Sequence, residues 1–349
     1  MSPRFQPSAD AAPAPLREVG GGEEARRALE AALFEIKRVI VGQEAMLERV
    51  LVALLARGHV LLEGVPGLAK TLTVKTVADV LGGSFRRVQF TPDLVPSDLV
   101  GTRIYRPDTG DFDTELGPVF CNFLLADEIN RAPAKVQSAL LEVMGERQVT
   151  IGPRTYPAPE PFLVMATQNP IESEGTYPLP EAQVDRFMLK VVVGYPGARD
   201  EAAVVARSLG QAAALERVLS VEGLGACQRA TERVYVDRPV AEYAVALASA
   251  TRALAEHGLE RLEPYVEVGA SPRGSINLVH GARALALLRG RAYALPQDVA
   301  DLAPDVLRHR LVLTYEALAE GVSPDTIVAE VIETVEQPRI ELARTGAAA

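Results

Sequence analysis

The chain has 349 residues, which is room for about two domains, because a typical domain has roughly 150. Its 36 Lys and Arg against 46 Asp and Glu give a net charge of −10, which argues against a large surface for nucleic-acid phosphates. Apolar residues make up 48% and charged residues 23%, the balance of a folded globular protein. Aromatic residues make up 5% and Trp is absent, so few aromatic side chains are available to stack on nucleic-acid bases. These values exclude a single small binding module and disfavour nucleic acid as a partner, while a local basic pocket is still allowed.

The sequence indicates no membrane span, no secretion signal and no metal centre. The longest apolar run, residues 50–56, is far shorter than the roughly 20 residues that cross a bilayer. The first 22 residues hold four prolines and no apolar core segment, which is not a signal-peptide pattern. Cys121 and Cys227 lie far apart in apolar surroundings, and the four histidines have no carboxylate or thiol at ligand spacing. We therefore expect a cytoplasmic protein with buried cysteines and no protein-liganded zinc or iron.

The first part of the structured chain alternates short apolar runs with helical patterns. An amphipathic helix starts near Glu23, and a second helix follows at about 44–57. Five strand-like runs then follow, at residues 59–63, 85–90, 122–126, 161–167 and 188–193. Their helix-length separations predict a five-stranded parallel sheet with helices on both faces. Residues 101–119 and 148–156 interrupt this pattern and are predicted to form hairpins around turns at 108–111 and 152–153.

The pattern becomes helical after Gly194. Residues 198–340 show helical periodicity, with caps at Ser271-Pro272 and Ser323-Pro324 and almost no strand signal. We therefore predict a flexible tail at 1–22, an α/β domain at 23–194, a helical domain at 195–340 and a second tail at 341–349.

A glycine-containing turn follows the first predicted strand and precedes a helix. It comprises Gly64, Val65, Pro66, Gly67, Leu68, Ala69, Lys70 and Thr71, with Leu72 next in the helix. Its backbone N–H groups and the helix N-terminus favour phosphate, Lys70 can reach the β and γ phosphates, and Thr71 can hold Mg²⁺. Ala69 stands where the strict pattern has glycine, so the alternative is an ordinary strand-to-helix turn with an incidental lysine.

Two adjacent carboxylates, Asp127 and Glu128, end the third predicted strand. Parallel sheets bind ligands at the carboxyl ends of their strands, so Asp127 can order Mg²⁺ and its waters. Glu128 is then placed to take a proton from an attacking water. The alternative is that the pair only begins the following helix, through 133–146. Together with the phosphate loop, the pair favours an ATP- and Mg²⁺-dependent site.

Five ordered motifs resemble those of the MoxR family of AAA+ ATPases. They are GVPGLAKT, VQFTPDLVPSDLVG, LLADEINRAPAKVQSALLEVMGERQV, ATQNPIESEGTYPLPEAQVDRF and GASPRG, and the resemblance covers residues 24–340. It removes the doubt over Ala69, because the family's phosphate loop carries alanine there. It implies a P-loop AAA+ domain with an all-α lid, ATP hydrolysis, and a ring that is expected to be a hexamer. It further implies chaperone-like remodelling or maturation of protein complexes, with a partner that contains a von Willebrand factor A domain.

The resemblance also implies roles for residues outside the two loops. Asn169 matches the sensor 1 residue that orients the attacking water, and Arg186 matches an arginine finger supplied to a neighbouring subunit. Arg273 matches the sensor 2 arginine of the lid, whether it acts within its own subunit or across the interface. Val41 and Gly42 match the segment that packs near adenine.

The sequence also allows a purely structural interpretation of each of these residues. Asn169 could cap the turn before a proline, Arg186 could form a surface pair with Asp185, and Arg273 could be solvated. Arg131 is a rival cation near the subunit boundary.

Three alternative functions also stay open. The first is the ATPase subunit of a magnesium or cobalt chelatase. The second is a DNA-acting motor, against which the acidic charge and the absence of a GAFTGA loop count. The third is a scaffold that binds ATP without turnover, which the intact set of polar residues disfavours.

Overall fold

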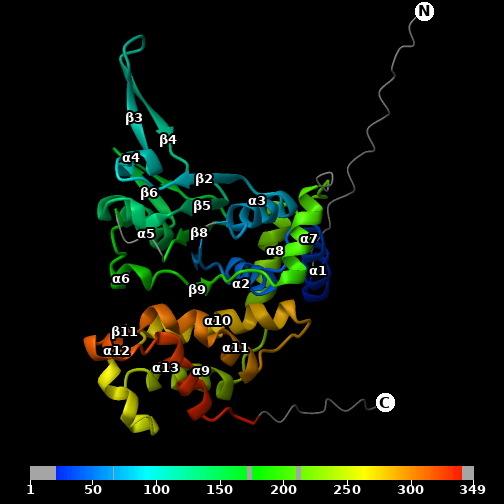
Figure 1. Ribbon diagram of the computed structural model, residues 1–349. Helices are drawn as coiled ribbons and strands as arrows, with labels where there is room; N and C mark the ends of the chain where they lie inside the picture. The colour runs from blue at the N-terminus through cyan, green and yellow to red at the C-terminus, as the bar shows by residue number, and fades with distance from the viewer. Residues whose placement is uncertain (1–20, 66, 171–174, 210–213, 340–349) are drawn as a thin grey trace, which may run out of the picture.

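A five-stranded parallel sheet forms the centre of the molecule (Figure 1). The computed structural model describes residues 21–65, 67–170, 175–209 and 214–339. The strands of the sheet are β1 (Val60–Glu63), β2 (Phe85–Gln89), β5 (Phe123–Asp127), β8 (Leu163–Gln168) and β9 (Leu189–Val192). They run in the order β2-β5-β8-β1-β9, with every neighbouring pair parallel. The predicted parallel sheet is confirmed, and the five apolar runs coincide with its strands.

Each face of the sheet has its own apolar core. In β5, Phe123 and Leu125 belong to one core, whereas Leu124 and Ala126 belong to the other. Strands buried on both faces have continuous apolar sequences, which is why β1, β5 and β8 show no polar alternation over most of their length. The first core includes α1 (Gly22–Lys37), α2 (Glu44–Leu55) and α3 (Lys70–Leu81), and the second includes α4 (Pro96–Val100) and α5 (Ala134–Glu146).

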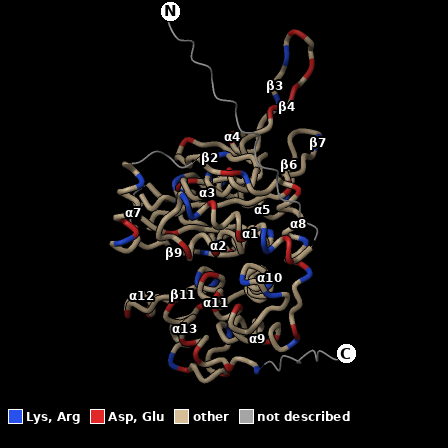
Figure 2. Tube along the Cα trace, turned by 90° about the vertical axis from the view of Figure 1, so that its right-hand side faces the viewer, with Lys and Arg blue, Asp and Glu red and all other residues tan. Residues whose placement is uncertain are grey.

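Both predicted hairpins are present. β3 (Gly101–Arg106) pairs with β4 (Asp111–Leu116), and β6 (Gln148–Ile151) pairs with β7 (Arg154–Pro157), each antiparallel. The β3–β4 hairpin projects away from the body (Figures 1 and 2). Gly101 allows the close approach at its base, since it has φ +101° and an added Cβ would lie 2.2 Å from the Glu115 carbonyl oxygen.

Where the structure describes it, the C-terminal part is helical, as predicted, apart from one short strand pair. Its helices, with the short α6 that precedes β9, are α6 (Glu181–Val184), α7 (Ala198–Ser208), α8 (Val221–Glu232), α9 (Arg238–Ala250), α10 (Pro272–Leu288), α11 (Pro296–Leu307), α12 (Tyr315–Glu320) and α13 (Pro324–Thr334). The predicted caps at Ser271 and Ser323 each accept a hydrogen bond from a backbone N–H of the following turn. The antiparallel pair β10 (Val266–Val268) and β11 (Val312–Leu313) was not predicted, because strands this short carry no periodic pattern.

Helices α7 and α8 lie beside the N-terminal helices, whereas α9 to α13 lie below the sheet in the view of Figure 1. The Gln228 side chain of α8 donates to the Leu54 carbonyl of α2 at 2.7 Å, and the Val218 N–H donates to the Val80 carbonyl of α3 at 2.9 Å. Helix α8 also contacts α10. Helix α8 thus contacts helices that precede residue 194 in the chain as well as a helix that follows it. The domain boundary at residue 194 therefore stays a prediction.

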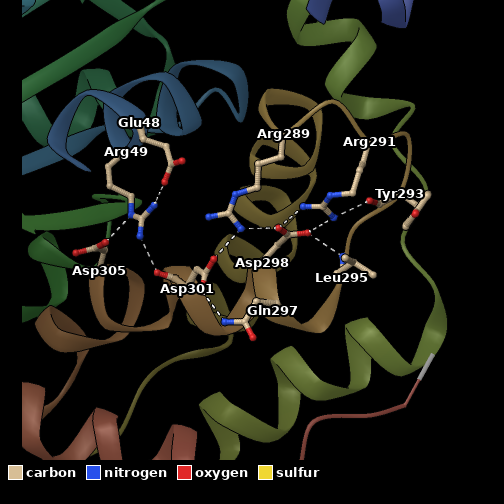
Figure 3. Close-up of polar contacts among 10 residues, drawn as sticks. All are labelled: Glu48, Arg49, Arg289, Arg291, Tyr293, Leu295, Gln297, Asp298, Asp301 and Asp305. Atoms are coloured by element: carbon tan, nitrogen blue, oxygen red, sulfur yellow. Dashed lines mark hydrogen bonds and ion pairs between the residues drawn. The ribbon is translucent and has the colours of Figure 1, made fainter. Parts of the chain in front are cut away.

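A charged network joins α2 to α11 (Figure 3). The largely buried Arg49 pairs with Asp305 at 2.7 Å and donates to the Asp301 carbonyl at 2.7 Å. The fully buried Asp298 accepts hydrogen bonds from Arg289, from Arg291 and from the Leu295 N–H. A buried carboxylate is tolerated only when its oxygens are paired in this way, so this network fixes the start of α11.

His59, just before β1, is buried and neutral. Its Nδ1 accepts a hydrogen bond from the Val164 N–H at 3.0 Å, and its Nε2 lies 3.3 Å from the Met144 carbonyl oxygen. Burial, with a smaller contribution from the charge of Arg147, lowers the pKa of His59 to about 3. The unfolded chain therefore binds a proton below pH 6.5 that the folded chain does not bind, and stability falls as the pH falls.

His59→Gln should reduce this acid sensitivity. The glutamine amide offers a hydrogen-bond acceptor and a donor but does not titrate. As the pH falls from 6 to 4, the free energy of unfolding of the variant should therefore fall less steeply than that of the wild type, by about 1.4 kcal/mol per pH unit. Urea unfolding at several pH values measures the slope. Equal slopes in the two proteins would contradict the assignment of this titration to His59.

Candidate active site

A pocket of about 460 Å³ opens at the carboxyl ends of β1, β5 and β8. Parallel sheets bind ligands at this edge, where strand ends and helix N-termini meet. Most of the predicted site residues line it, namely Gly64, Gly67, Leu68, Ala69, Lys70, Thr71, Leu72, Asp127, Glu128 and Asn169. Pro66 lies outside the described residues, and Val65 packs against the first apolar core instead.

The phosphate loop turns sharply between β1 and α3. An added Cβ on Gly64 would lie 2.6 Å from the Val193 carbonyl oxygen, whereas Gly67, at φ +87°, has open space at that position. Ala69 is left-handed at φ 55° and immediately precedes α3. The left-handed conformation costs a non-glycine residue roughly 1–2 kcal/mol, which explains why the strict phosphate-loop pattern has glycine at this position. The loop thus presents the N-terminus of α3 to the pocket, where phosphate binds favourably.

Lys70 is half-buried within this loop. Its Nζ donates to the Gly64 carbonyl at 2.5 Å. Burial lowers the pKa of Lys70, and the nearby carboxylates of Asp127 and Glu128 act in the opposite direction. Phosphate oxygens bound in the pocket would add to the effect of these carboxylates and further stabilise the charged form of this partly desolvated ammonium.

Asp127 and Glu128 both line the pocket, although neighbouring residues of a strand point to opposite faces. The reason is that Glu128 is left-handed, at φ 55°, so the chain leaves the strand direction after Asp127. The Asp127 carboxylate accepts from Thr167 Oγ1 at 2.6 Å and pairs with Arg87 at 2.6 Å. The Glu128 carboxylate accepts from Gln89 at 2.9 Å and pairs with Arg131 at 2.8 Å. The rival cation Arg131 thus contacts Glu128 of its own chain.

Thr167 is a residue that the sequence did not single out. Besides donating to Asp127, its hydroxyl accepts the Glu128 N–H at 2.8 Å, so it holds both acidic positions. Arg87 and Gln89 were missed as well, and both line the pocket. Their polar side chains alternate with apolar ones along β2, which was the available signal. Asn169, buried just past the end of β8, lies at the same edge, as predicted.

Val41 and Gly42 lie in a neighbouring hollow of about 210 Å³ with Asp200 and Arg207 of the α7 region. Gly42 has φ +70°, and an added Cβ would lie 2.6 Å from the Asp200 Cβ. The next residue, Gln43, donates to the Gly194 carbonyl at 3.2 Å, one residue from the Val193 carbonyl that faces Gly64. The segment at 193–194 therefore connects this hollow with the phosphate loop.

Arg186 and Arg273 do not line the pocket. Arg186 follows α6 and donates to the Leu141 carbonyl of α5. Arg273 pairs with Asp185 at 3.3 Å, and Ser271 and Arg310 bind the same carboxylate. We call Asp185, Ser271, Arg273 and Arg310 the Asp185 cluster. The structure thus places Arg273 on the carboxylate of the residue before Arg186, and both arginines lie outside the pocket.

Thr71 and Asp127 fit a magnesium ion bound together with phosphates. Mg²⁺ keeps few protein ligands and takes the rest from phosphate and water, and both residues line the pocket. Within the described part of the chain, no group of three or more His, Cys, Asp or Glu side chains forms a metal site. Cys121 and Cys227 are buried free thiols, and burial raises the pKa of each to about 12. No helix among the described residues is both long and apolar enough to cross a bilayer.

Comparisons with known proteins agree with this site. The family described as "ATPase family associated with various cellular activities (AAA)" matches residues 59–189, and the family described as "AAA lid domain" matches residues 259–331. The chain is 57% identical to Chaperone MoxR1 of Mycobacterium tuberculosis over 312 residues, which cover 89% of this chain and 83% of that protein. It is 45% identical to YeaC of Bacillus subtilis over 320 residues, covering 90% and 97%.

A solved structure agrees as well. The crystal structure of a candidate ATPase from Cytophaga hutchinsonii superposes with a TM-score of 0.86 at 46% identity, covering 91% of this chain and 97% of that one. Fold and site together define an AAA ATPase with a lid domain. The relatives narrow this class, and the chain belongs to the MoxR family of AAA+ ATPases, as its motifs indicated.

Thr167→Val should lower the rate of ATP hydrolysis by about 10- to 100-fold. The substitution keeps the shape but removes a hydroxyl that bonds an ionised carboxylate, and such bonds contribute about 1.5–3 kcal/mol. Steady-state phosphate release measures the effect. Thr167→Ser keeps the hydroxyl and is the matched control, with activity near that of the wild type. Equal activity of the valine variant would show that the acidic pair needs no such support.

Proposed function

We propose that this chain hydrolyses ATP with Mg²⁺ in the pocket at the carboxyl edge of its sheet. The observation that supports this most directly is the meeting of Lys70, Asp127 and Glu128 in one pocket beside the N-terminus of α3. Lys70 binds the β and γ phosphates together with backbone N–H groups of the loop. Thr71 and Asp127 hold the Mg²⁺, which neutralises charge on the phosphates when bound.

The remaining pocket residues act on the attacking water. Glu128 takes its proton, and the Asn169 amide orients it. Glu128 is held on the pocket side by Gln89 and Arg131, so its carboxylate is already at the edge where the γ phosphate would lie. Leu68, Ala69 and Leu72 shape the loop, and Val41 and Gly42 provide the neighbouring hollow for adenine.

We further propose that the site is completed by a second copy of the chain in a hexameric ring. Arg186 and Arg273 lie outside the pocket, bound to Leu141 and Asp185. An arginine that stabilises the transferring phosphoryl group must reach it, so these two are presented to the pocket of a neighbour. One relative is named a chaperone. On that basis the output is chaperone-like remodelling of protein complexes. The motifs that resemble the MoxR family further imply a partner with a von Willebrand factor A domain, and we place this complex in the cytoplasm.

Two variants separate nucleotide binding from hydrolysis. Lys70→Ala removes the ammonium and should weaken ATP binding by about 10- to 100-fold, since hydrogen bonds to charged groups contribute about 1.5–3 kcal/mol. Glu128→Gln keeps the size and polarity of the side chain, so it should bind ATP as the wild type does while turnover falls at least about 100-fold. Fluorescent-nucleotide titration and phosphate release measure the two effects. Normal turnover in Glu128→Gln would rule out Glu128 as the base.

Mixing two inactive variants tests the shared site. Arg186→Ala alone should lose about 10³-fold in turnover, the usual contribution of an arginine finger. When it is mixed with Glu128→Gln, some interfaces join an intact pocket to an intact Arg186, and activity should rise above that of either variant. The nucleotide affinity of Arg186→Ala should match the wild type. No recovery in mixtures that assemble, as judged by light scattering, would contradict the supply of Arg186 by a neighbour.

A further inference from the structure

Arg310 is a buried arginine that holds the chain on both sides of Arg186. It ends the 3-10 turn Arg308–Arg310, directly after α11, and its side chain is 1% exposed. Its Nε donates to the Asp185 carboxylate at 2.8 Å. Its Nη2 donates to the backbone carbonyls of Asp185 at 3.1 Å and Phe187 at 2.7 Å, and its Nη1 reaches the Met188 carbonyl at 3.3 Å. One guanidinium thus fixes three carbonyls of the four-residue segment that contains Arg186.

The energetics of this contact favour a fixed geometry. Burial lowers the pKa of Arg310 to about 10, while the carboxylate of Asp185 opposes that change, so the side chain stays charged at neutral pH. A buried charge needs nearly all of its hydrogen bonds to be made. The segment at 185–188 therefore cannot shift relative to the 3-10 turn without leaving a buried guanidinium unpaired.

Asp185 connects this contact to the second predicted arginine. Its carboxylate accepts from Arg310 through Oδ1, from Ser271 at 3.0 Å and from Arg273 at 3.3 Å. Arg273 lies in the first turn of α10, whose positive dipole end repels a cation, and the carboxylate offsets that repulsion. The positions of Arg186 and Arg273 therefore depend on the same ion pair.

The 3-10 turn itself is joined to the sheet and to α2. Arg308 donates to the Lys190 carbonyl of β9 at 2.7 Å and pairs with Asp305 at 2.6 Å. Asp305 in turn pairs with Arg49 of α2, as Figure 3 shows. A displacement of α11 relative to α2 or β9 would therefore act on the turn that carries Arg310.

We propose that Arg310 and Asp185 are positioning residues for the arginines that a subunit presents to its neighbour. This inference rests on the proposed function, because it requires Arg186 to act across the interface. Neither Arg310 nor Asp185 touches nucleotide in this scheme. They fix the backbone at 185–188 to the lid, so that the lid of one subunit sets the hydrolysis rate in the pocket of the next.

The test uses Arg310→Gln in the full chain. Turnover should fall at least tenfold, while ATP affinity, measured by fluorescent-nucleotide titration, stays within twofold of the wild type. Mixing with Glu128→Gln should raise activity above either variant alone, because Glu128→Gln subunits supply correctly placed arginines to the intact pockets of Arg310→Gln subunits. In the double variant with Arg186→Ala, the loss of turnover should be smaller than the product of the two single losses, because Arg310 acts in part through Arg186, and any further loss reflects Arg273.

Two further variants test whether the loss of turnover comes from general misfolding instead of from the lost contact. Asp185→Asn removes the carboxylate but leaves the backbone carbonyls bound to Arg310, and it should show the same loss of turnover and the same recovery on mixing. Arg310→Lys keeps the charge, but its three N–H donors on one nitrogen are too few for the Asp185 carboxylate and the three carbonyls together, so it should recover only part of the activity. Arg291→Gln is the matched control, because Arg291 pairs with the buried Asp298 and its hydrogen bonds stay within residues 293–298. Asp298 keeps its hydrogen bonds from Arg289 and from the Leu295 N–H in this variant, so turnover should stay well above that of Arg310→Gln even where the melting temperature falls.

The outcomes separate this inference from the proposed function. If Arg186→Ala is inactive and recovers on mixing while Arg310→Gln and Asp185→Asn hydrolyse ATP normally, the positioning role is wrong and the shared site stands. Loss of turnover in Arg310→Gln and Asp185→Asn without recovery on mixing would place the damage in their own pockets and would also overturn the inference. If Arg186→Ala hydrolyses ATP normally, the arginine-finger assignment fails, and this inference fails with it.

Discussion

The parallel pairing of β5, β8 and β1 is the constraint on which the site depends. Parallel strands end at the same edge, so a residue at the end of each is brought together however far apart they lie in the chain. Thr167 of β8 pairs with Leu62 of β1 and, through its hydroxyl, bonds both Asp127 and the Glu128 N–H. The same edge receives the phosphate loop that follows β1. A slip of one residue between β8 and β5 would turn Thr167 to the other face and separate the two carboxylates from their common support.

A second constraint lies in the connection between the lid and the sheet. Arg49 and Arg308 tie α11 to α2 and to β9, and the Arg310 contact continues this connection to the segment at 185–188. The pocket and the Asp185 cluster are consequently held by different sets of contacts, one at the sheet edge and one at the lid. In the proposed function, this separation lets a subunit bind nucleotide in its own pocket while its lid positions cations for another.

The sequence predicted the elements well because their signals are local. Buried strands of a parallel sheet are short apolar runs, and the glycine turn, the acidic pair and the Ser-Pro caps each occupy a few consecutive residues. The residues that were missed have no such signal. Arg310 resembles any arginine at the end of a helix, and Thr167 is one of several polar residues near a strand end. Their importance comes from partners that lie 125 and 40 residues away in the chain.

By itself, the sequence determined the parallel sheet, the two hairpins, the helical C-terminal part and most of the groups that line the pocket, although not Arg87, Gln89 or Thr167. The existence and burial of the strands follow from the apolar pattern, and the chemistry of lysine and carboxylate follows from residue type, whereas the strand order came from the structure. Only the tertiary structure decided that Arg186 and Arg273 lie apart from Lys70 and are joined through Asp185 to a buried Arg310. The reason is that these contacts come from the packing of α11 and the following turn against α6 and β9, which no local pattern specifies.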